Sequence, residues 1–124
     1  MRSRSRLEHV RRERFHFTLI ILKALLPMDD FNINEEKKRF ELKVDNHIAF
    51  IEYILSTDNT MFLTHTEVPH ALEGKGVGSR IVERTLFYIT DHGYKLAPLC
   101  PFVAKYLTRH PEFQAILAPG YHVG

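Results

Sequence analysis

Three glycines at alternate positions, Gly74, Gly76 and Gly78, separate an extended run that ends at Val68 from a helical run that reaches His92. Glycine tolerates a positive φ and allows another backbone or a ligand to approach closely. A helix that begins here directs its free N–H groups and the positive end of its dipole into the space beside the glycines. The pattern therefore predicts a loop that can bind a phosphate group, although a glycine-rich turn without a ligand has the same pattern.

The residues around the glycines favour an anion and exclude two well-known phosphate loops. Lys75 adds a positive charge, and the next acidic residue after Glu73 is Glu83, more than two helical turns further on. A dinucleotide-binding fingerprint requires G-x-G-x-x-G, whereas the spacing here is G-x-G-x-G followed by Ser79. A P-loop requires Gly-Lys-Ser/Thr, whereas Gly76 follows Lys75.

Before the loop, short segments with strand patterns are separated by turn signals. Residues 39–44 alternate between polar and apolar, which is typical of a half-buried strand. Residues 48–55 are nearly continuously apolar, which predicts a strand covered on both faces. Asp45 and Asn46 form a hairpin signal, and residues 57–59 form another turn. The expected product is an antiparallel meander of four strands, at residues 31–34, 39–44, 48–55 and 60–68.

After the loop, the pattern changes to helix, strand and helix. We predict a helix over 79–92, a fifth strand over 94–99 parallel to the fourth, and a last helix from Pro101 to residue 109. Because Pro98 cannot donate to a strand ladder, the fourth and fifth strands should part near it and leave a gap beside the loop. Residues 118–124 are predicted to be loose. The fold class is therefore α/β, with a mixed, mostly antiparallel sheet of about five strands and two main helices.

Charge divides the chain into two parts. Residues 1–27 hold seven Lys/Arg against two Glu, a net charge of +5, and the apolar run 15–26 is too short to span a bilayer. A signal peptide, a transit peptide and an upstream extension of a protein that starts at Met28 all fit this segment. We favour the extension, or a disordered or loosely docked leader, and assign the folded domain to residues 28–124.

The composition of the domain excludes several partners. Residues 28–124 hold ten Lys/Arg against thirteen Asp/Glu, a net charge of −3, which argues against nucleic acid as the main partner. No membrane partner is expected, and the oligomeric state stays open. The single cysteine, Cys100, excludes an internal disulfide and suits a reducing compartment, so we expect a cytoplasmic protein. The histidines show no His-x-x-x-His spacing, and no metal site is expected.

Taken in order, these motifs resemble the GNAT superfamily of acetyl-CoA-dependent N-acetyltransferases. The superfamily signature Gln/Arg-x-x-Gly-x-Gly/Ala corresponds to residues 73–78, with Glu73 in place of the usual Gln or Arg. The Pro-x-Cys-Pro motif that contains Cys100 is similar to that of the minimal single-domain branch of the superfamily. The resemblance covers roughly residues 31–115, and its four motifs lie at residues 65–69, 74–79, 98–103 and 110–113.

The resemblance implies how acetyl-CoA, as the co-substrate, would lie. Its pantetheine arm would enter the gap between the fourth and fifth strands and pair with backbone near Val68. The thioester would then point toward His65, Glu67 and Cys100. The pyrophosphate would accept hydrogen bonds from the backbone of the loop, at Gly74, Lys75, Gly76, Val77, Gly78 and Ser79.

Cys100 stands just before Pro101, at the expected N-cap of the last helix. Helix N-termini stabilise a thiolate, so Cys100 could accept the acyl group as a nucleophile. It could instead line the thioester pocket, and a free cysteine is also commonly a small buried hydrophobe. Both the covalent route and direct attack by the amine remain open.

The fourth strand supplies the candidates for a general base. Alternation predicts that Met61, Leu63, His65 and Glu67 share one face of that strand. His65 has a suitable intrinsic pKa, and Glu67 could accept a proton directly or through water. A hydrogen-bonded histidine that only orients the turn is the alternative. The resemblance makes Tyr106 a candidate acid for the leaving thiolate, and core packing is its alternative role.

Two functions therefore follow from the sequence. The first is transfer of an acetyl group from acetyl-CoA to an amine whose identity the sequence does not give. The second is a binding or interaction module for acyl-CoA with little or no turnover, because so small a domain has few elements from which to build an acceptor pocket.

Overall fold

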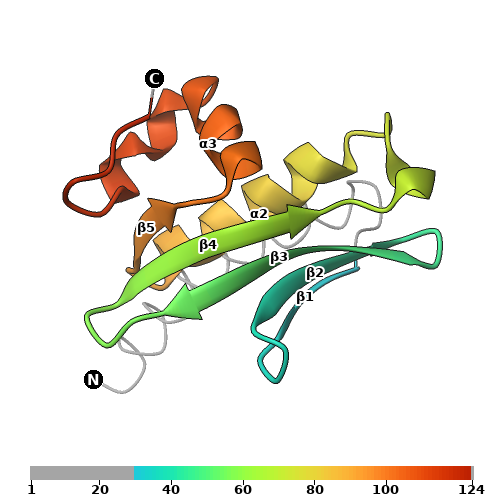
Figure 1. Cartoon of the computed structure of the whole chain (residues 1–124), viewed down its shortest axis with the longest axis horizontal. Coiled ribbons are helices and arrows are strands. Elements are labelled where there is room, and N and C mark those ends of the chain that lie inside the picture. The colour runs from blue at the N-terminus through green and yellow to red at the C-terminus, as the bar shows by residue number, and fades with distance from the viewer. Residues whose placement is uncertain (1–29, 124) are drawn as a thin grey trace, which may run out of the picture.

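A five-stranded sheet carries two main helices in the computed structural model, which describes residues 30–123 (Figure 1). The strands lie in chain order, the first four antiparallel and the fifth parallel to the fourth, which confirms the mixed sheet. The expectations for residues 1–27 fall outside the described residues. The elements are β1 (Asp30–Asn34), β2 (Arg39–Val44), β3 (His47–Leu55), β4 (Thr60–Glu67), the 3₁₀-helix η1 (His70–Leu72), α2 (Val77–Asp91), β5 (Lys95–Pro98), α3 (Pro101–Thr108) and the 3₁₀-helix η2 (Pro111–Ile116).

The hairpin between β2 and β3 is the two-residue turn that the sequence predicts. Val44 pairs with His47, and the two residues between them, Asp45 and Asn46, have φ values of 51° and 64°. Both central residues of a type I′ turn need a positive φ, which Asp and Asn tolerate better than most side chains do. The local chemistry of this turn therefore fixes the register of the hairpin.

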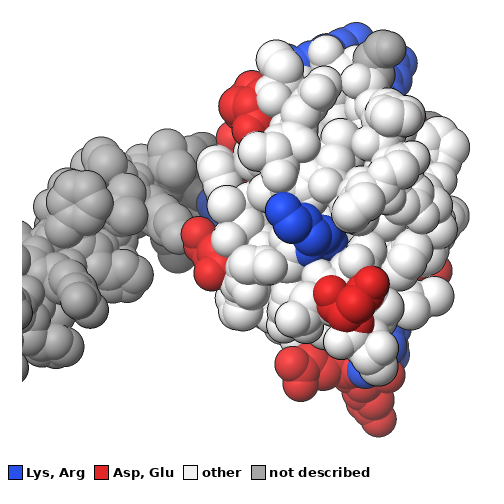
Figure 2. All heavy atoms as spheres, turned by 90° about the vertical axis from the view of Figure 1, so that its left-hand side faces the viewer, with Lys and Arg blue, Asp and Glu red and all other residues white. Residues whose placement is uncertain are grey.

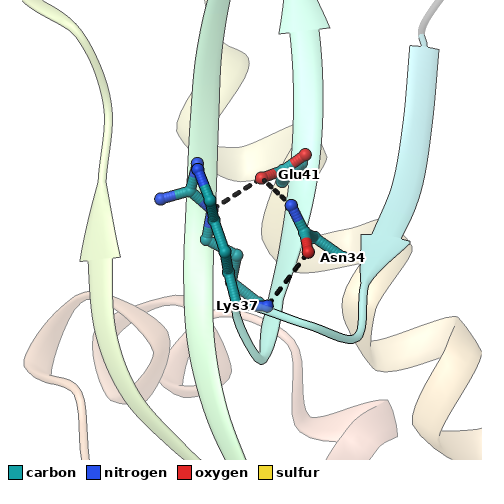
Figure 3. Close-up of polar contacts among 4 residues, drawn as sticks. Asn34, Lys37 and Glu41 are labelled. Carbon is teal, nitrogen blue, oxygen red and sulfur yellow. Dashed lines mark hydrogen bonds and ion pairs between the residues drawn. The ribbon is translucent and has the colours of Figure 1, made fainter.

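A polar cluster joins the first two strands beside their turn (Figure 3). Arg39 Nε lies 2.6 Å from Glu41 Oε2, and Asn34 Nδ2 donates to the same oxygen at 3.2 Å. The Lys37 backbone N–H donates to Asn34 Oδ1 at 3.0 Å. The Arg39 guanidinium also lies 4.2 Å from the centre of the Phe50 ring. The side chains of Arg39 and Glu41 are only 19% and 12% exposed, so this ion pair is partly removed from water.

Glu41→Ala is expected to destabilise the domain by about 1–2 kcal/mol, because it leaves two partly buried donors, on Arg39 and Asn34, without their acceptor. Urea denaturation followed by circular dichroism measures the change. Glu36→Ala, an exposed carboxylate in the adjoining turn, is the control and should change stability by less than about 0.5 kcal/mol. Equal effects of the two substitutions would show that the cluster contributes nothing specific.

The core lies between one face of the sheet and the two helices. Helix α2 packs on β2 and β3, and α3 packs on β4 and β5. The apolar face predicted for α2 is buried, and Gly93 follows the helix with φ +72°, as its predicted role in the C-terminal cap requires. The strand residues that form this core are Phe40, Leu42, Ala49, Ile51, Tyr53, Met61, Leu63 and Leu96, and the helix residues include Val77, Ile81, Val82, Leu86, Ile89, Val103 and Leu107.

The prediction that β3 is covered on both faces is wrong. Only its alternate residues Ala49, Ile51 and Tyr53 are buried, whereas Ile48 and Ile54 on the opposite face are 40% and 60% exposed. An uninterrupted apolar run does not reveal which face the helices cover, since both faces then read alike. We call the face away from α2 the open face of the sheet.

A β-bulge in β4 changes which side chains face the core. Leu63 pairs with Tyr53 and His65 pairs with Glu52, so Thr64 is an extra residue on β4. Because neighbouring residues of β3 point to opposite faces, Leu63 and His65 do so as well. The prediction that Met61, Leu63, His65 and Glu67 share one face is therefore wrong beyond the bulge.

Strands β4 and β5 part at Pro98, as the sequence predicted. Their pairing ends at Leu63 and Pro98, and the Leu63 carbonyl then accepts hydrogen bonds from the backbone N–H groups of Leu99 and Cys100, at 3.1 and 2.9 Å. From there the chain turns into α3. Within residues 30–123, no strand pairs with this edge of β4 between Thr64 and Glu67. The predicted gap is thus present beside the loop.

The C-terminal tail is docked, and the prediction that it is loose is wrong. The Ala118 backbone N–H donates to the Leu96 carbonyl at 2.8 Å, and Leu117 forms a parallel bridge with Leu96 at the free edge of β5. Further on, Gln114 Nε2 donates to the Val123 carbonyl at 3.2 Å. The edge that β5 leaves unpaired therefore receives the tail.

The end of the molecule at which β4 begins and the chain ends is mainly uncharged. Its described surface carries separate charged side chains of both signs and no continuous basic patch (Figure 2). Among residues 30–123, no helix is both long and apolar enough to cross a membrane.

Candidate functional site

A groove of about 280 Å³ follows the glycine loop at the start of α2. Gly74 and Gly76 have φ values of +80° and +74°, and a Cβ at either position would meet no atom within 4 Å. Gly76 is the N-cap of α2, and the helix begins at Val77, two residues before its predicted start at Ser79. The groove is lined by Val68, Leu72, Glu73, Gly74, Gly76, Val77, Gly78, Ser79 and Phe102.

Backbone N–H groups at the start of α2 are available to a ligand. The first intrahelical bond at this end runs from the Arg80 N–H to the Gly76 carbonyl at 3.1 Å. Among the described residues, the N–H groups of Val77, Gly78 and Ser79 have no backbone partner, and no side chain caps them. The first turn contains no acidic residue, so the helix dipole makes this end attractive to an anion.

The charged side chains of the loop form ion pairs with residues that do not line the groove. Lys75 Nζ lies 3.3 Å from Asp45 Oδ2, and both side chains are more than half exposed. Glu73 Oε1 lies 3.0 Å from His70 Nδ1. Since exposed ion pairs are weak, Lys75 can contribute only a modest attraction for an anion, and the backbone N–H groups remain the main donors.

Gly78 and Val77 have structural roles beside their N–H groups. A Cβ on Gly78 would stand 2.4 Å from Phe102 Cζ, so the absence of a side chain lets α3 pack against α2. The Val77 side chain is 1% exposed and belongs to the core. Only the backbone of these two residues therefore faces the groove.

Cys100 is the N-cap of α3 and is 4% exposed. Its thiol donates to Thr66 Oγ1 at 3.1 Å, across the gap where β4 and β5 have parted. Pro101 occupies the first position of the helix, as predicted. The buried position of this side chain suits a residue that lines the gap.

His65 and Glu67 form a separate pair on the open face. His65 Nε2 lies 2.9 Å from Glu67 Oε1, and the two side chains are 54% and 55% exposed. The His65 ring also lies 6.3 Å from the ring of Phe50. As alternate residues of β4 the two share a face, and the bulge at Thr64 makes it the face opposite to that of Leu63.

Tyr106 lines a second pocket, which adjoins the groove and does not include Cys100. Its ring stacks on His110 with centroids 4.1 Å apart. Burial raises the pKa of Tyr106 above its ordinary value, and the charges of Glu83 and Glu112 raise that pKa further. Tyr106 therefore stays protonated at neutral pH and can donate a proton.

Sequence reasoning missed two residues of the site, Thr66 and Phe102. Thr66 pairs with Ile51 on the helix-covered face, where it meets Cys100. Only the bulge puts it there, and the strand alternation gave no sign of it. Phe102 lines both pockets, and helical spacing from Tyr106 could have indicated its position.

Within residues 30–123, no three His, Cys, Asp or Glu side chains gather in a group that could hold a metal ion.

Comparison with known families gives a match that covers most of the described chain. The family model described as GCN5-related N-acetyl-transferase matches residues 39–116. The match runs from β2 through η2 and therefore includes the glycine loop, the bulge and Cys100.

Individual proteins support this match at low identity. Protein NATD1 of Xenopus tropicalis is 24% identical over 97 residues, which span 73% of this chain and 87% of that protein. Protein NATD1 of Mus musculus is 23% identical over 82 residues, which span 63% of this chain and 73% of that protein. The solution structure of a GCN5-like protein of Staphylococcus aureus superposes with a TM-score of 0.58 at 22% identity, over 75% of this chain and 91% of that one, and shares the fold.

Proposed function

Since this chain belongs to the GCN5-related N-acetyltransferase family, we propose that it binds acetyl-CoA and transfers the acetyl group to an amine acceptor. Membership of the family supports acyl transfer in general. Acetyl-CoA as the donor and an amine as the acceptor are the specific parts of the proposal.

The observation that carries the proposal is the glycine groove at the start of α2. Three consecutive N–H groups at a helix N-terminus, with no acidic residue in the first turn, match the acceptor oxygens of a pyrophosphate. Gly74 and Gly76 leave the space beside these groups free of side chains. These features of the groove support binding of the pyrophosphate of coenzyme A there.

The unpaired edge of β4 supports a place for the pantetheine arm. The groove reaches Val68, which follows that edge directly. The arm contains two amide groups, and backbone groups between Thr64 and Glu67 that no described strand pairs can serve as their partners. An arm bound there would bring the thioester toward Cys100 and Thr66.

His65 and Glu67 are the proposed proton acceptors. An amine must lose its ammonium proton before it can attack the thioester carbonyl. With the Glu67 carboxylate as acceptor of the 2.9 Å hydrogen bond, His65 Nε2 carries a proton and Nδ1 is left to receive another. The carboxylate also stabilises the imidazolium that then forms. Tyr106 is proposed as the donor of a proton to the leaving thiolate.

A binding module with little turnover is the second candidate. The observation that favours it is the separation of the His65–Glu67 pair, on the open face, from Cys100, on the helix-covered face. In that case the groove would still bind coenzyme A, but no base would lie beside the thioester.

Calorimetry with acetyl-CoA, followed by an assay of released thiol with a panel of amines, tests both candidates. We expect binding, and release of coenzyme A that at least one amine accelerates more than tenfold over buffer. Tight binding without acceleration by any small amine or lysine peptide would favour the binding module. Absence of binding would contradict both.

A further inference from the structure

A basic pocket of about 240 Å³ adjoins the glycine groove. Three of its residues, Lys105, Arg109 and His110, are basic, and none is Asp or Glu. We call it the basic pocket; its lining is completed by Ser79, Phe102 and Tyr106.

The two strongest cations of the basic pocket lack ion-pair partners among residues 30–123. Arg39 is paired with Glu41 and Lys75 with Asp45, but Lys105 and Arg109 form no such pair. His110 is the exception, because its Nδ1 lies 3.1 Å from Glu112 Oε2. Lys105 in the last turn of α3 and Arg109, its C-cap, thus line the same pocket without an ion pair, although the carboxylates of Glu83 and Glu112 act electrostatically on Tyr106 between them.

The basic pocket continues the glycine groove. Ser79 and Phe102 line both, and the Phe102 ring lies directly against Gly78 at the start of α2. A ligand whose pyrophosphate is held by the N–H groups of the first turn can therefore extend in two directions. One leads along β4 toward Val68, and the other leads into the basic pocket.

This inference rests on the proposed function. If the pantetheine arm of coenzyme A follows β4, its other half, adenosine with a phosphate on the ribose 3′-oxygen, must leave the pyrophosphate toward the basic pocket. That phosphate is one ribose away from the pyrophosphate and carries up to two negative charges. We propose that Lys105 and Arg109 bind the 3′-phosphate of coenzyme A and so distinguish it from 3′-dephospho-coenzyme A.

The side chains fit this ligand in two ways. Arg can hold phosphate oxygens through two parallel N–H donors, and Lys adds a point charge. Phe102, 43% exposed, and the Tyr106–His110 stack offer flat surfaces for a purine. Cations near the C-terminus of α3 would also stabilise the helix by interacting with its dipole, without any ligand. The experiment must therefore distinguish a role in ligand binding from a role in helix stability.

Calorimetry with coenzyme A and with 3′-dephospho-coenzyme A distinguishes the two roles. It is carried out on four proteins: the wild type, Lys105→Gln, Arg109→Gln and the double variant. We expect the wild type to bind coenzyme A about tenfold more tightly than 3′-dephospho-coenzyme A. One charge-assisted hydrogen bond contributes roughly this much affinity. Each single variant should narrow this difference, and the double variant should bind the two ligands equally. Affinity for the dephospho ligand should stay within twofold throughout.

Lys95→Gln is the matched control. It removes one exposed cation from β5, outside the basic pocket, and should keep the tenfold preference. Equal binding of both ligands to the wild type, or a parallel loss for both in the variants, would overturn the proposal while leaving coenzyme A binding intact. Failure of the folded wild type to bind either ligand would instead reject the proposed function, and this inference with it.

Discussion

Gly76→Val should abolish measurable coenzyme A binding, by more than about 100-fold, while the domain stays folded. Gly76 lines the groove, and its Cβ would enter space that holds no protein atom within 4 Å. A valine there would occupy the volume proposed for the pyrophosphate and move the chain away from φ +74°. Calorimetry with coenzyme A measures the loss, and thermal melting measures folding.

Gly93→Val is the matched control because it reproduces the backbone strain without touching the groove. Gly93 has φ +72° and lies just beyond the C-terminal end of α2. A Cβ added there would also meet no atom within 4 Å. A side chain in this left-handed region costs about 1–2 kcal/mol at either position. Both variants should therefore melt earlier by similar amounts, and only Gly76→Val should lose binding. If a folded Gly76→Val protein kept its affinity, the phosphate would bind elsewhere.

The features of the fold that the sequence predicted correctly depend on local chemistry. Asp45 and Asn46 tolerate positive φ, Pro98 cannot continue a ladder, and Pro101 suits the first position of a helix. Each of these signals needs only the residue itself and its immediate neighbours. For the same reason the glycine loop could be recognised before its place in the fold was known.

The features that could not be predicted depend on contacts between distant segments. The bulge at Thr64 arises from the register between β3 and β4, and a single extra residue moves every later side chain to the other face. The tail docks because β5 has a free edge, which no property of residues 117–123 reveals. The basic pocket similarly needs α3 to approach Ser79, and Gly78 permits that approach.

The bulge also bears on the mechanism, because it separates the two groups of candidate catalytic residues. Cys100 is buried and hydrogen-bonded to Thr66, whereas His65 and Glu67 are exposed on the open face. A covalent route would need Cys100 as a thiolate, and the hydrogen bond would then run in the opposite direction, from the Thr66 hydroxyl to the sulfur. Direct attack needs only a base for the amine, and the His65–Glu67 pair can accept a proton. If the acetyltransferase proposal holds, we therefore expect direct attack.

His65→Ala should accordingly lower kcat by about 10²- to 10⁴-fold, the usual contribution of a general base, with little change in coenzyme A affinity. In direct transfer His65 first takes the ammonium proton, and the C–N bond then forms as the C–S bond breaks. The thiolate leaves with the proton of Tyr106, and Tyr106 regains a proton from the second one that the attacking nitrogen loses. His47→Ala removes another exposed histidine of the sheet and should leave the rate within twofold.

Cys100→Ser should keep most of the wild-type rate, because a hydroxyl can still donate to Thr66 and fill the same space. Steady-state assays of thiol release measure all three variants. Intact-mass measurement after incubation with acetyl-CoA and no amine should find no acetyl group on the wild type. An acetyl group trapped on Cys100 and passed on to an added amine would establish the covalent route, and Cys100→Ser should then lose activity by orders of magnitude.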